Sequence, residues 1–519
     1  MNPPATQRMP SGIPYIIANE FAERFCYYGI NAFLAIYMVR FLNFGEAQAT
    51  EWQSLFKSGA YFFPLLGAIL SDVFLGKFRT IIGFSLVYCA GCTTLALSSG
   101  DTGLAVGLAL MAIGTGGIKP CVSTNVGDQF TTQNEHLIER AFSWFYMSIN
   151  AGSVISILLC PWLLEEGGPR WAFGVPAAAM FVATAVFWMG RARFAVVPPA
   201  GRAWLTELTS ADGRALIARL AVIYLFIAVF WSLWDQSNGT TWTLQAQSGL
   251  MDKHLGFGIV LLPAQIQFVN AVFILMLVPV FSYGIYPLMG RFFEVTPLRK
   301  IGIGFFVAAL SFVVIAWIEG RIQQGIVTSL WWQILAYGIL TAAEVLVSIT
   351  ALEFSYRQAP LRMKSFIMAL FLLSTSIGNL FTAVVADSVM RPIPGVVVQP
   401  GAETRLQLPP GHGFVAGQKI DFGGETGLTV ERPDGKQVPL AGTFVVAALE
   451  GDRALLNDVV DRKPVASSGI FQAQSASVST WRLVGPQFFL FFAGLMSVTG
   501  IGWIFVAMRY REKTYVREA

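Results

Sequence analysis

Apolar segments long enough to cross a membrane recur along the whole chain, and this repetition constrains the fold more than any other feature of the sequence. A membrane-spanning helix needs about 20 predominantly apolar residues. Six such segments lie near 13–42, 54–75, 79–98, 103–127, 140–164 and 172–190, and six more lie near 216–244, 258–287, 299–318, 330–356, 364–390 and 482–509. The composition agrees, because 55% of the residues are hydrophobic and 13% are charged. We therefore predict an all-α integral membrane protein with 12 transmembrane helices.

The spacing of the segments also predicts how the chain is divided. Two groups of six helices indicate two pseudo-symmetric bundles with a site between them near the middle of the membrane. The predicted parts are an N-terminal six-helix bundle (1–190), a cytoplasmic connector (191–215), helices 7–11 of the C-terminal bundle (216–391), an extracytoplasmic insert (392–480), and helix 12 with a cytoplasmic tail (481–519).

The insert has a different composition from the rest of the chain. Residues 396–480 are rich in glycine and proline and contain short alternating apolar runs such as KIDFGG and GTFVVAAL. A PDG turn signal stands between two further extended runs. We predict a small β-rich antiparallel domain and favour a spacer role over a binding role, because nothing in it resembles a site.

Basic residues predict which ends of the helices face the cytoplasm, since Lys and Arg concentrate in cytoplasmic loops. One set of loops contains residues such as Lys77, Arg140, Arg191, Arg214 and Arg299, whereas the opposite loops contain only Arg40, Arg170, Lys253 and Arg321. We predict cytoplasmic N- and C-termini in a multi-pass protein of the cell inner (plasma) membrane. The start of the chain lacks the regions of a cleaved signal. The net charge of +4 then reflects topology, and no nucleic-acid partner is predicted.

The five cysteines all lie within predicted helices and show no disulfide framework. Cys89 and Cys92 form a CxxC pair, but no further cysteine or histidine stands nearby. We interpret them as small residues at helix contacts rather than as a metal or redox site.

A charged stripe interrupts the first apolar segment, in the sequence EFAERFCYYG. Glu20, Glu23, Arg24 and Tyr27 follow the spacing i, i+3, i+4, i+7, which places them on one face of a helix. Each charge in the middle of a membrane costs about 2.5–3.5 kcal/mol on insertion scales, so such residues face an interior or a cavity. The alternative is a buried ion pair that only stabilises helix packing. One arginine would need only one acid for that purpose, whereas the stripe contains two.

Further charges and amides lie within other apolar segments. Arg24 and Lys119 belong to the first bundle, whereas Asp235 and Glu344 belong to the second. A cavity with cations on one wall and acids on the other suits a zwitterion, whose carboxylate and ammonium groups face opposite walls. Two amides, Asn150 and Asn270, can each donate and accept hydrogen bonds. They suit either a peptide bond or hydrogen bonds between helices.

Several of these segments resemble the proton-dependent oligopeptide transporter family of the major facilitator superfamily. The resemblance rests on ERFCYYG in the first segment, GIKPCVSTNVGDQF in the fourth, FYMSINAGS in the fifth and ALEFSYRQAP after the tenth. The loop GAILSDVFLGKFRTI is similar to that of the wider superfamily. The resemblance implies the major facilitator fold and a proton-coupled symporter that imports di- and tripeptides by alternating access.

The resemblance also implies roles for individual residues. Arg24 and Lys119 would receive the peptide carboxylate, while Glu344, Asn150 and Asn270 would receive its amino end and backbone. The implied side-chain pockets are lined by Tyr27, Tyr28, Tyr61, Trp231 and Phe371. Proton coupling would rest on Glu20, Glu23, Arg24, Lys119 and Asp235. The implied gating residues are Asp72, Lys77, Arg79 and Pro120. The implied partners are small peptides, protons and the lipid bilayer, with no obligate protein partner and no cofactor besides the coupling protons.

The sequence departs from the family pattern in three places. Asn31 stands where many members have a second arginine, so Asp235 lacks its expected cation. Asp235 would then bond to Asn31, pair elsewhere or be protonated part of the time, and Lys57 is a candidate partner unless it extends to the membrane surface. The histidines His136, His254 and His412 all lie in predicted loops, so proton coupling would rest on carboxylates. The third departure from the family pattern is the insert at residues 392–480.

Two rival functions follow from the same residues. The same fold transports other small solutes in some relatives, such as amino acids, peptide-like drugs or anions, although a simple anion would leave Glu344 with nothing to bind. A membrane enzyme or sensor is the second rival. We predict no enzyme, because the sequence contains no HExxH motif, no GxSxG elbow and no metal cluster. A sensor would lack a cytoplasmic signalling domain.

Overall fold

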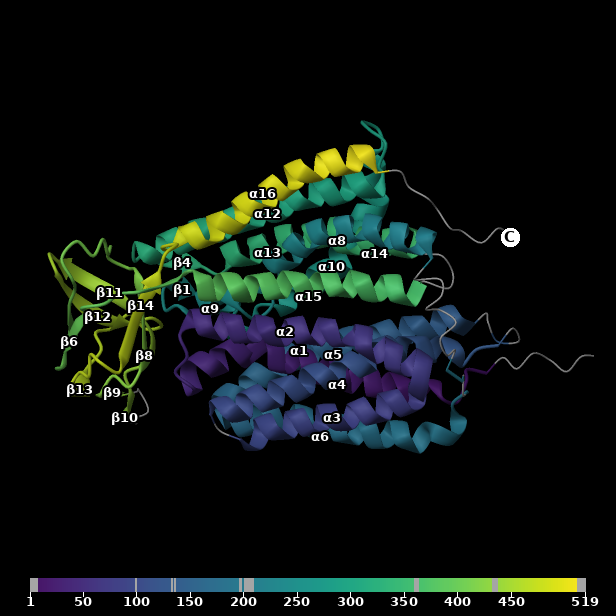
Figure 1. The fold of residues 1–519 in the computed structure, drawn as a ribbon, viewed down its shortest axis with the longest axis horizontal. Helices are drawn as coiled ribbons and strands as arrows, with labels where there is room; N and C mark the ends of the chain where they lie inside the picture. The colour runs from purple at the N-terminus through teal and green to yellow at the C-terminus, as the bar shows by residue number, and fades with distance from the viewer. Residues whose placement is uncertain are drawn as a thin grey trace, which may run out of the picture.

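A computed structural model describes residues 8–98, 100–131, 134, 137–195, 198–199, 210–358, 364–431 and 437–510. The long helices run side by side along the longest axis of the molecule (Figure 1). The β-strands of residues 390–481 gather at one end, which we call the insert end. The last described helix, α16 (Pro486–Arg509), runs from the insert to the opposite end, which we call the terminal end.

The first half of the chain forms one bundle of six long helices. They are α1 (Ile13–Phe41), α2 (Glu46–Ile69), α3 (Lys77–Leu97), α4 (Asp101–Asp128), α5 (Ile138–Gly167) and α6 (Pro169–Met189). A continuous apolar core joins them, with fully buried Phe33, Tyr88 and Phe173 among its largest side chains.

The second half forms another bundle around its own apolar core. Its long helices are α8 (Ala211–Ser237), α10 (Phe268–Val280), α12 (Pro297–Gln323), α13 (Trp331–Glu344), α15 (Lys364–Ser388) and α16 (Pro486–Arg509), and its short ones are α9 (Thr241–Gln247), α11 (Tyr286–Met289) and α14 (Thr350–Gln358). The helix α12 begins where a threonine cap and a proline favour it, because the Thr296 hydroxyl accepts a hydrogen bond from the Arg299 amide at 3.3 Å and Pro297 follows.

Three membrane crossings, one in the first bundle and two in the second, include π-helical turns. They are η1 (Leu70–Leu75) after α2, η5 (Phe281–Ile285) between α10 and α11, and η6 (Val345–Ile349) between α13 and α14. A π-helical turn inserts an extra residue into a helix and rotates the side chains on either side of it.

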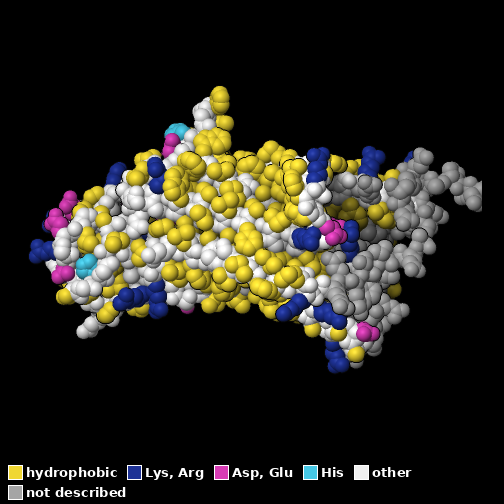
Figure 2. Space-filling view, turned by 90° about the horizontal axis from the view of Figure 1, so that it is seen from above, with side chains coloured by type: hydrophobic (Ala, Val, Ile, Leu, Met, Phe, Trp, Pro, Cys, Tyr) yellow, Lys and Arg dark blue, Asp and Glu magenta, His cyan; other side chains and the backbone are white. Residues whose placement is uncertain are grey.

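Within the described residues, 11 helical spans are long and apolar enough to cross a membrane. The helix α1 is the remaining long helix of the first bundle, with 29 residues, and its charged stripe separates it from the others. The predicted fold class is confirmed: the protein is a helical membrane protein with a β-rich insert near its C-terminus. Hydrophobic side chains cover the middle of the face in Figure 2, and charged ones lie mostly toward its two ends, as expected for a lipid-facing surface.

One predicted helix begins later than its hydropathy indicates. The segment 258–287 was expected to be helical throughout, but β2 (His254–Gly256) and β3 (Ile259–Val260) form a short antiparallel hairpin, followed by a 3₁₀ turn, η4 (Pro263–Gln265). Gly256 and Gly258 adopt positive φ angles of 93° and 76°, which favour a turn over a helix. His254 therefore starts a strand rather than lying in a loop, while His136 lies outside the described residues.

The insert contains a seven-stranded antiparallel sheet and a smaller sheet packed around one apolar core. The large sheet has the order β5-β14-β8-β11-β12-β7-β6, with bounds β5 (Met390–Pro392), β6 (Val397–Gln399), β7 (Arg405–Gln407), β8 (Lys419–Gly424), β11 (Gly442–Glu450), β12 (Arg453–Asp458) and β14 (Ala476–Trp481). The small sheet joins β9 (Leu428–Glu431) to β10 (Gln437–Pro439) and β13 (Ser467–Gly469). The predicted PDG turn between β9 and β10 lies outside the described residues, but the two strands pair antiparallel as expected.

The remaining short strands, β1 (Met251–Asp252) and β4 (Thr328–Ser329), pair in parallel between α9 and α13. The five cysteines are free and buried, and the Cys26 thiol donates a hydrogen bond to the Pro176 carbonyl at 2.7 Å.

Helices α2 and α4 approach closely at glycine residues. A Cβ atom added at Gly67 would lie 2.7 Å from the Cα of Gly117 and closer still to the Gly116 carbonyl oxygen, so only glycine fits there. Gly67→Ala is expected to lower the free energy of unfolding by about 1–3 kcal/mol. Gly83→Ala on α3 is the matched control, because nothing lies within 4 Å of its added Cβ. Unfolding in mixed detergent micelles measures both, and equal stability of the two variants would contradict the close approach.

Candidate functional site

The charged stripe of α1 forms a compact ion cluster. Arg24 donates from Nε to Glu20 Oε1 at 2.7 Å, and the same nitrogen lies 3.4 Å from Glu23 Oε2. Glu23 also accepts a hydrogen bond from the hydroxyl of Thr115 on α4. Both carboxylates are essentially buried, whereas 14% of the arginine side chain is exposed. One guanidinium thus serves two acids, and the arginine is the member that a solute can reach.

A second cation lies beside this cluster and forms no ion pair with any described residue. The ammonium of Lys119 on α4 stands 4.0 Å from the ring centre of Tyr27 and 4.5 Å from that of Tyr61. Aromatic faces attract cations, but they do not replace a hydrogen-bond acceptor. Among the described residues, the Lys119 Nζ is a buried donor with no hydrogen-bond partner. Such a group is costly to leave unsatisfied, which is a feature of a site prepared for an anionic ligand.

A cavity of about 250 Å³ lies between the two bundles. The first bundle contributes Tyr28, Asn150 and Ser153 to its lining, and the second contributes Trp234, Asn270 and Glu344. Because both bundles line it, a relative movement of the bundles changes its shape and its access.

The acidic wall of this cavity is built by α10 and α13. Glu344 is the last residue of α13, and the π-helical turn η6 begins at the next residue. The Asn270 amide on α10 donates to Glu344 Oε2 at 2.8 Å and to the Thr341 hydroxyl at 3.0 Å. These bonds, together with a hydrogen-bond interaction from Trp234, hold the carboxylate in place on the cavity wall. Asn150 on the opposite wall donates to the Tyr146 carbonyl at 2.8 Å.

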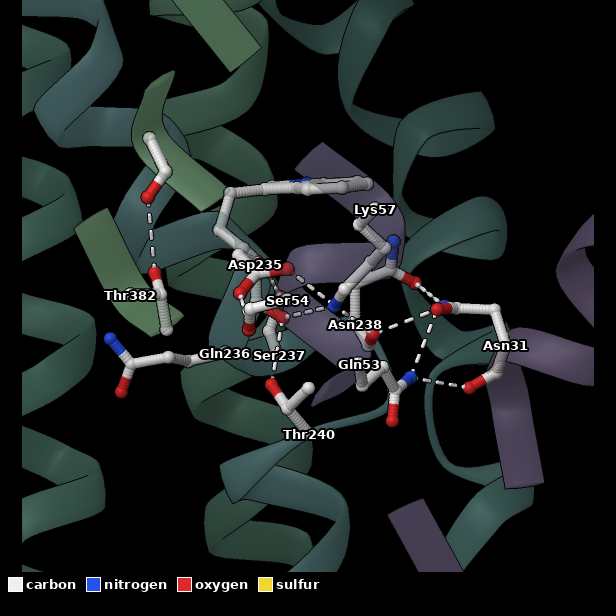
Figure 3. A network of polar contacts seen from close by, with 12 residues as sticks. Asn31, Gln53, Ser54, Lys57, Asp235, Gln236, Ser237, Asn238, Thr240 and Thr382 are labelled. Atoms are coloured by element: carbon white, nitrogen blue, oxygen red, sulfur yellow. Dashed lines mark hydrogen bonds and ion pairs between the residues drawn. The ribbon is translucent and has the colours of Figure 1, made fainter. Parts of the chain in front are cut away.

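A buried polar network near the last turn of α8 joins the bundles, and Figure 3 shows its side chains. Lys57 of α2 forms an ion pair with Asp235 of α8, and both side chains are at most 1% exposed. Lys57 also donates to the carbonyl of Asn238 at 2.9 Å, and Ser54 donates to Asp235 Oδ2 at 2.6 Å. Asn31 donates to the Asn238 carbonyl at 3.1 Å, so it contacts the segment after α8 rather than Asp235 itself. Of the partners left open for Asp235, the structure selects Lys57.

The predicted aromatic residues lie in three different places. Tyr28 lines the cavity, and Tyr27 and Tyr61 lie under the Lys119 ammonium. Trp231 and Phe371 pack against each other in the second core, with ring centres 6.3 Å apart. The cavity lining described here includes neither of these last two residues.

Three of the four predicted gating residues, Asp72, Lys77 and Arg79, lie at the terminal end of the first bundle. Lys77 at the start of α3 pairs with Asp128 at the end of α4, which is a contact within that bundle. Asp72 lies in η1, Arg79 is exposed on α3, and Pro120 lies within α4 directly after Lys119. A brace between the bundles therefore stays a prediction. Within the described residues, no group of three or more His, Cys, Asp or Glu side chains is arranged to hold a metal ion.

Sequence reasoning did not identify several polar members of these networks. Thr115 precedes Lys119 by four residues and Ser54 precedes Lys57 by three, so each shares a helix face with its charged neighbour. This spacing was a usable signal. Asn238 had no such signal, because it lies beyond the end of α8 and accepts hydrogen bonds through its backbone carbonyl as well as its side-chain oxygen.

Comparison with known protein families assigns the chain to one of them. The profile of the PTR2 (POT) family matches residues 78–211 and 201–396, more than half of the 519-residue chain. The chain belongs to the POT family. The resemblance noted in the sequence is thereby confirmed.

Relatives and solved structures of this family agree with the fold. Solute carrier family 15 member 2 of Danio rerio is 38% identical over 367 residues, which cover 61% of this chain and 51% of that protein. The POT family chain thus spans about half the length of the curated relatives it matches. A crystal structure of the POT family transporter PepTSo is 34% identical with a TM-score of 0.68, covering 74% of this chain and 90% of that one.

A further structure extends the likeness to the insert. A crystal structure described as an autoinhibited POT family peptide transporter is 27% identical with a TM-score of 0.73, and the match covers 98% of this chain and 99% of that one. Coverage this complete leaves no room for the insert to fall outside the aligned region.

Proposed function

We propose that this POT family protein is a proton-coupled symporter that imports di- and tripeptides by alternating access between its two bundles. One observation carries the proposal: a cavity between the bundles has a carboxylate, Glu344, on one wall and Tyr28 on the other, and two cations lie in the bundle that contributes Tyr28. Neither cation is among the residues that line the cavity: Arg24 stands four residues before Tyr28 on α1, and Lys119 lies over the ring of Tyr27. The solved relative described as a peptide transporter supports the substrate class. The terminal end would face the cytoplasm and the insert end the outside of the plasma membrane.

The charges suit the two ends of a short peptide. The peptide carboxylate would bind Lys119, which lacks a hydrogen-bond partner among the described residues, and the exposed part of Arg24. The peptide ammonium would bind the carboxylate of Glu344, and the amides of Asn150 and Asn270 would bind the peptide backbone. A neutral or purely anionic solute would leave one of these charges without a partner.

Proton coupling would act through competition for Arg24. The guanidinium is shared by Glu20 and Glu23 in the absence of substrate. A proton on either carboxyl removes one of its charges and frees the arginine for the peptide carboxylate. Return of the arginine to both acids after peptide release would expel the proton on the same side, so the two movements are linked.

Access would alternate through the Lys57–Asp235 network. In this structure the network links α2 to α8 close to the end of α8 that faces the insert, where it would close the site in that direction. Opening toward the outside requires these buried polar bonds to separate. Asp235 would therefore contribute to coupling as a gate residue, apart from the peptide site.

Uptake of labelled dialanine into proteoliposomes tests the proposed function. We expect accumulation only with an inward proton gradient, and at least a tenfold loss in Glu344→Gln, because a lost charge-assisted hydrogen bond is worth about 1.5–3 kcal/mol. Glu353→Gln is the matched control, since Glu353 lies on α14 of the same membrane crossing and its 53% exposed side chain pairs with Arg357 away from the cavity. Gradient-independent uptake would overturn the coupling, and equal uptake by the two variants would overturn the role of Glu344.

A further inference from the structure

The insert is attached firmly to the second bundle. Its strands connect α15 to α16, and both helices belong to that bundle. The Val460 carbonyl of the insert accepts a hydrogen bond from the Gly249 amide, just after α9, at 2.5 Å. Gly417 and Gly485 both lie against Gln323 at the end of α12. The insert therefore moves with the second bundle.

The same insert also reaches across to the first bundle. The Thr443 hydroxyl of β11 accepts from the amide of Glu46, the first residue of α2, at 2.8 Å. Asp421 of β8 accepts a hydrogen bond from Thr443 and lies against Gly45. Nothing in the chain connectivity requires these contacts, because the loop between α1 and α2 is far from the insert in sequence.

One side chain of the insert bonds to both bundles at once. The ammonium of Lys419 on β8 lies 2.6 Å from Glu46 Oε2 of α2 and 3.7 Å from Glu319 Oε1 of α12. Both carboxylates are less than a tenth exposed. Burial acts to lower the pKa of Lys419, but the two carboxylates outweigh it and hold the pKa above its ordinary value, so the lysine stays charged.

We propose that the insert is a latch, in which Lys419 binds Glu46 of the first bundle and Glu319 of the second and thereby holds the insert end closed. The inference rests on the proposed alternating access. When the bundles separate at the insert end, Lys419 cannot remain bonded to both acids, and Thr443 loses the Glu46 amide. The latch thus sets the balance between the closed and open forms of that end, a role beyond that of a spacer.

Other charged and polar groups face this cluster and define the conditions of a test. Gln245 of α9 donates to Glu319 Oε2 at 2.8 Å, and Arg462 lines the same small pocket as Lys419. Burial and, to a smaller extent, the nearby Glu46 raise the pKa of Asp421 to about 6 against the opposing effects of Thr443, Lys419 and Trp481. Measurements at pH 7.5 lie above this pKa, so Asp421 is mostly ionised in the unaltered protein.

Spin-label distances across the insert end test the latch without any substrate. Labels at Thr102→Cys on α4 and Gln324→Cys after α12 occupy exposed positions on the two bundles, while the native cysteines are all buried. Loss of a charge-assisted hydrogen bond changes an equilibrium constant by about tenfold, so Lys419→Met should raise the ratio of long to short distances by about that factor. The exposed insert residue Lys463→Met is the matched control and should leave the distribution unchanged. Identical distributions for both variants would overturn the latch, whatever the protein transports.

A reversible cross-link provides an independent test. Gly45→Cys with Asp421→Cys joins the insert to the first bundle, because a Cβ at Gly45 would lie 2.7 Å from the Asp421 carboxylate. Gly249→Cys with Asp461→Cys joins the insert only to the second bundle. The Cβ at Gly249 would lie 3.5 Å from the Asp461 Cα and 2.5 Å from the Val460 carbonyl oxygen, so the backbone there must shift slightly. With cross-linking verified by mass spectrometry, the first disulfide should abolish dialanine uptake until it is reduced, and the second should not. Full uptake with the first disulfide formed would overturn the proposal, and failure of uptake in the reduced wild type would instead concern the proposed function.

Discussion

Lys57→Met is expected to lower the free energy of unfolding by about 3–5 kcal/mol, because it leaves a buried carboxylate without its cation. Asp235 is fully buried, and Lys57 supplies both its ion pair and two hydrogen bonds to backbone carbonyls of the opposite bundle, those of Asp235 and Asn238. The remaining partner of the carboxylate, Ser54, is neutral. The loss therefore falls on the contact between α2 and α8 rather than on either bundle alone.

A double-mutant cycle separates this effect from simple damage to packing. Asp235→Leu should be destabilising by a similar amount, because it leaves the lysine as the uncompensated charge. The double variant Lys57→Met/Asp235→Leu should be more stable than either single variant, since replacing both members of a buried pair by apolar groups is close to neutral. Unfolding in mixed micelles of increasing denaturing-detergent content measures all three. Additive losses in the double variant would show that the two charges do not depend on each other.

An exposed ion pair gives the matched control for this cycle. On α14, Arg357 Nη2 lies 2.5 Å from Glu353 Oε1, but the two side chains are 60% and 53% exposed. Arg357→Met should change the free energy of unfolding by less than about 1 kcal/mol, because solvent screens such a pair. A loss as large as that of Lys57→Met would mean that burial is not what makes the Lys57–Asp235 pair important.

The fold was predictable from the sequence because membrane helices depend on local composition. A run of about 20 apolar residues is enough to indicate a spanning helix, and α1, α12 and α16 begin within a few residues of the predicted positions. The error at residues 258–267 has a local cause as well. Hydropathy does not register the left-handed backbone at Gly256 and Gly258, which turns the chain into a hairpin before α10 begins.

The polar sites were predictable only in part, because helix faces do not reveal their partners. Arg24, Glu20 and Glu23 are close in sequence, so their spacing alone predicted a shared face. Lys57 and Asp235 are in different bundles, and the sequence left three fates open for the aspartate. Lys419 in the strand KIDFGG gave no signal, since the two acids that bind it, Glu46 and Glu319, belong to helices from opposite bundles. Contacts of this kind depend on how whole bundles and the insert pack together.

Glu20→Gln and Glu23→Gln are expected to abolish concentrative uptake while leaving peptide counterflow. The amide keeps the shape of the carboxyl and can still accept a hydrogen bond from Arg24, but it cannot take up and release a proton. Exchange of labelled for unlabelled peptide needs the site to alternate without net proton movement, whereas accumulation needs the proton gradient. We expect gradient-driven accumulation to fall at least tenfold in each variant, with counterflow kept within about twofold.

The geometry distinguishes the two carboxylates further. Glu20 has the short bond to Arg24, at 2.7 Å, whereas Glu23 is 3.4 Å from the same nitrogen and also accepts a hydrogen bond from Thr115 of α4. Glu20→Gln should therefore weaken the hold on Arg24 more and lower the peptide concentration needed for half-maximal counterflow. Glu23→Gln should show less of this effect, because Thr115 keeps holding that side chain in place.

Glu166→Gln on α5 is the control, since Glu166 is an exposed acid of the same bundle outside the cluster. It should retain both accumulation and counterflow. Equal loss of both activities in Glu20→Gln and Glu23→Gln would mean that the two acids only support the structure around Arg24. Retained accumulation in both would move proton coupling away from α1, and the buried Asp235 at the bundle interface would then be the carboxylate to test next.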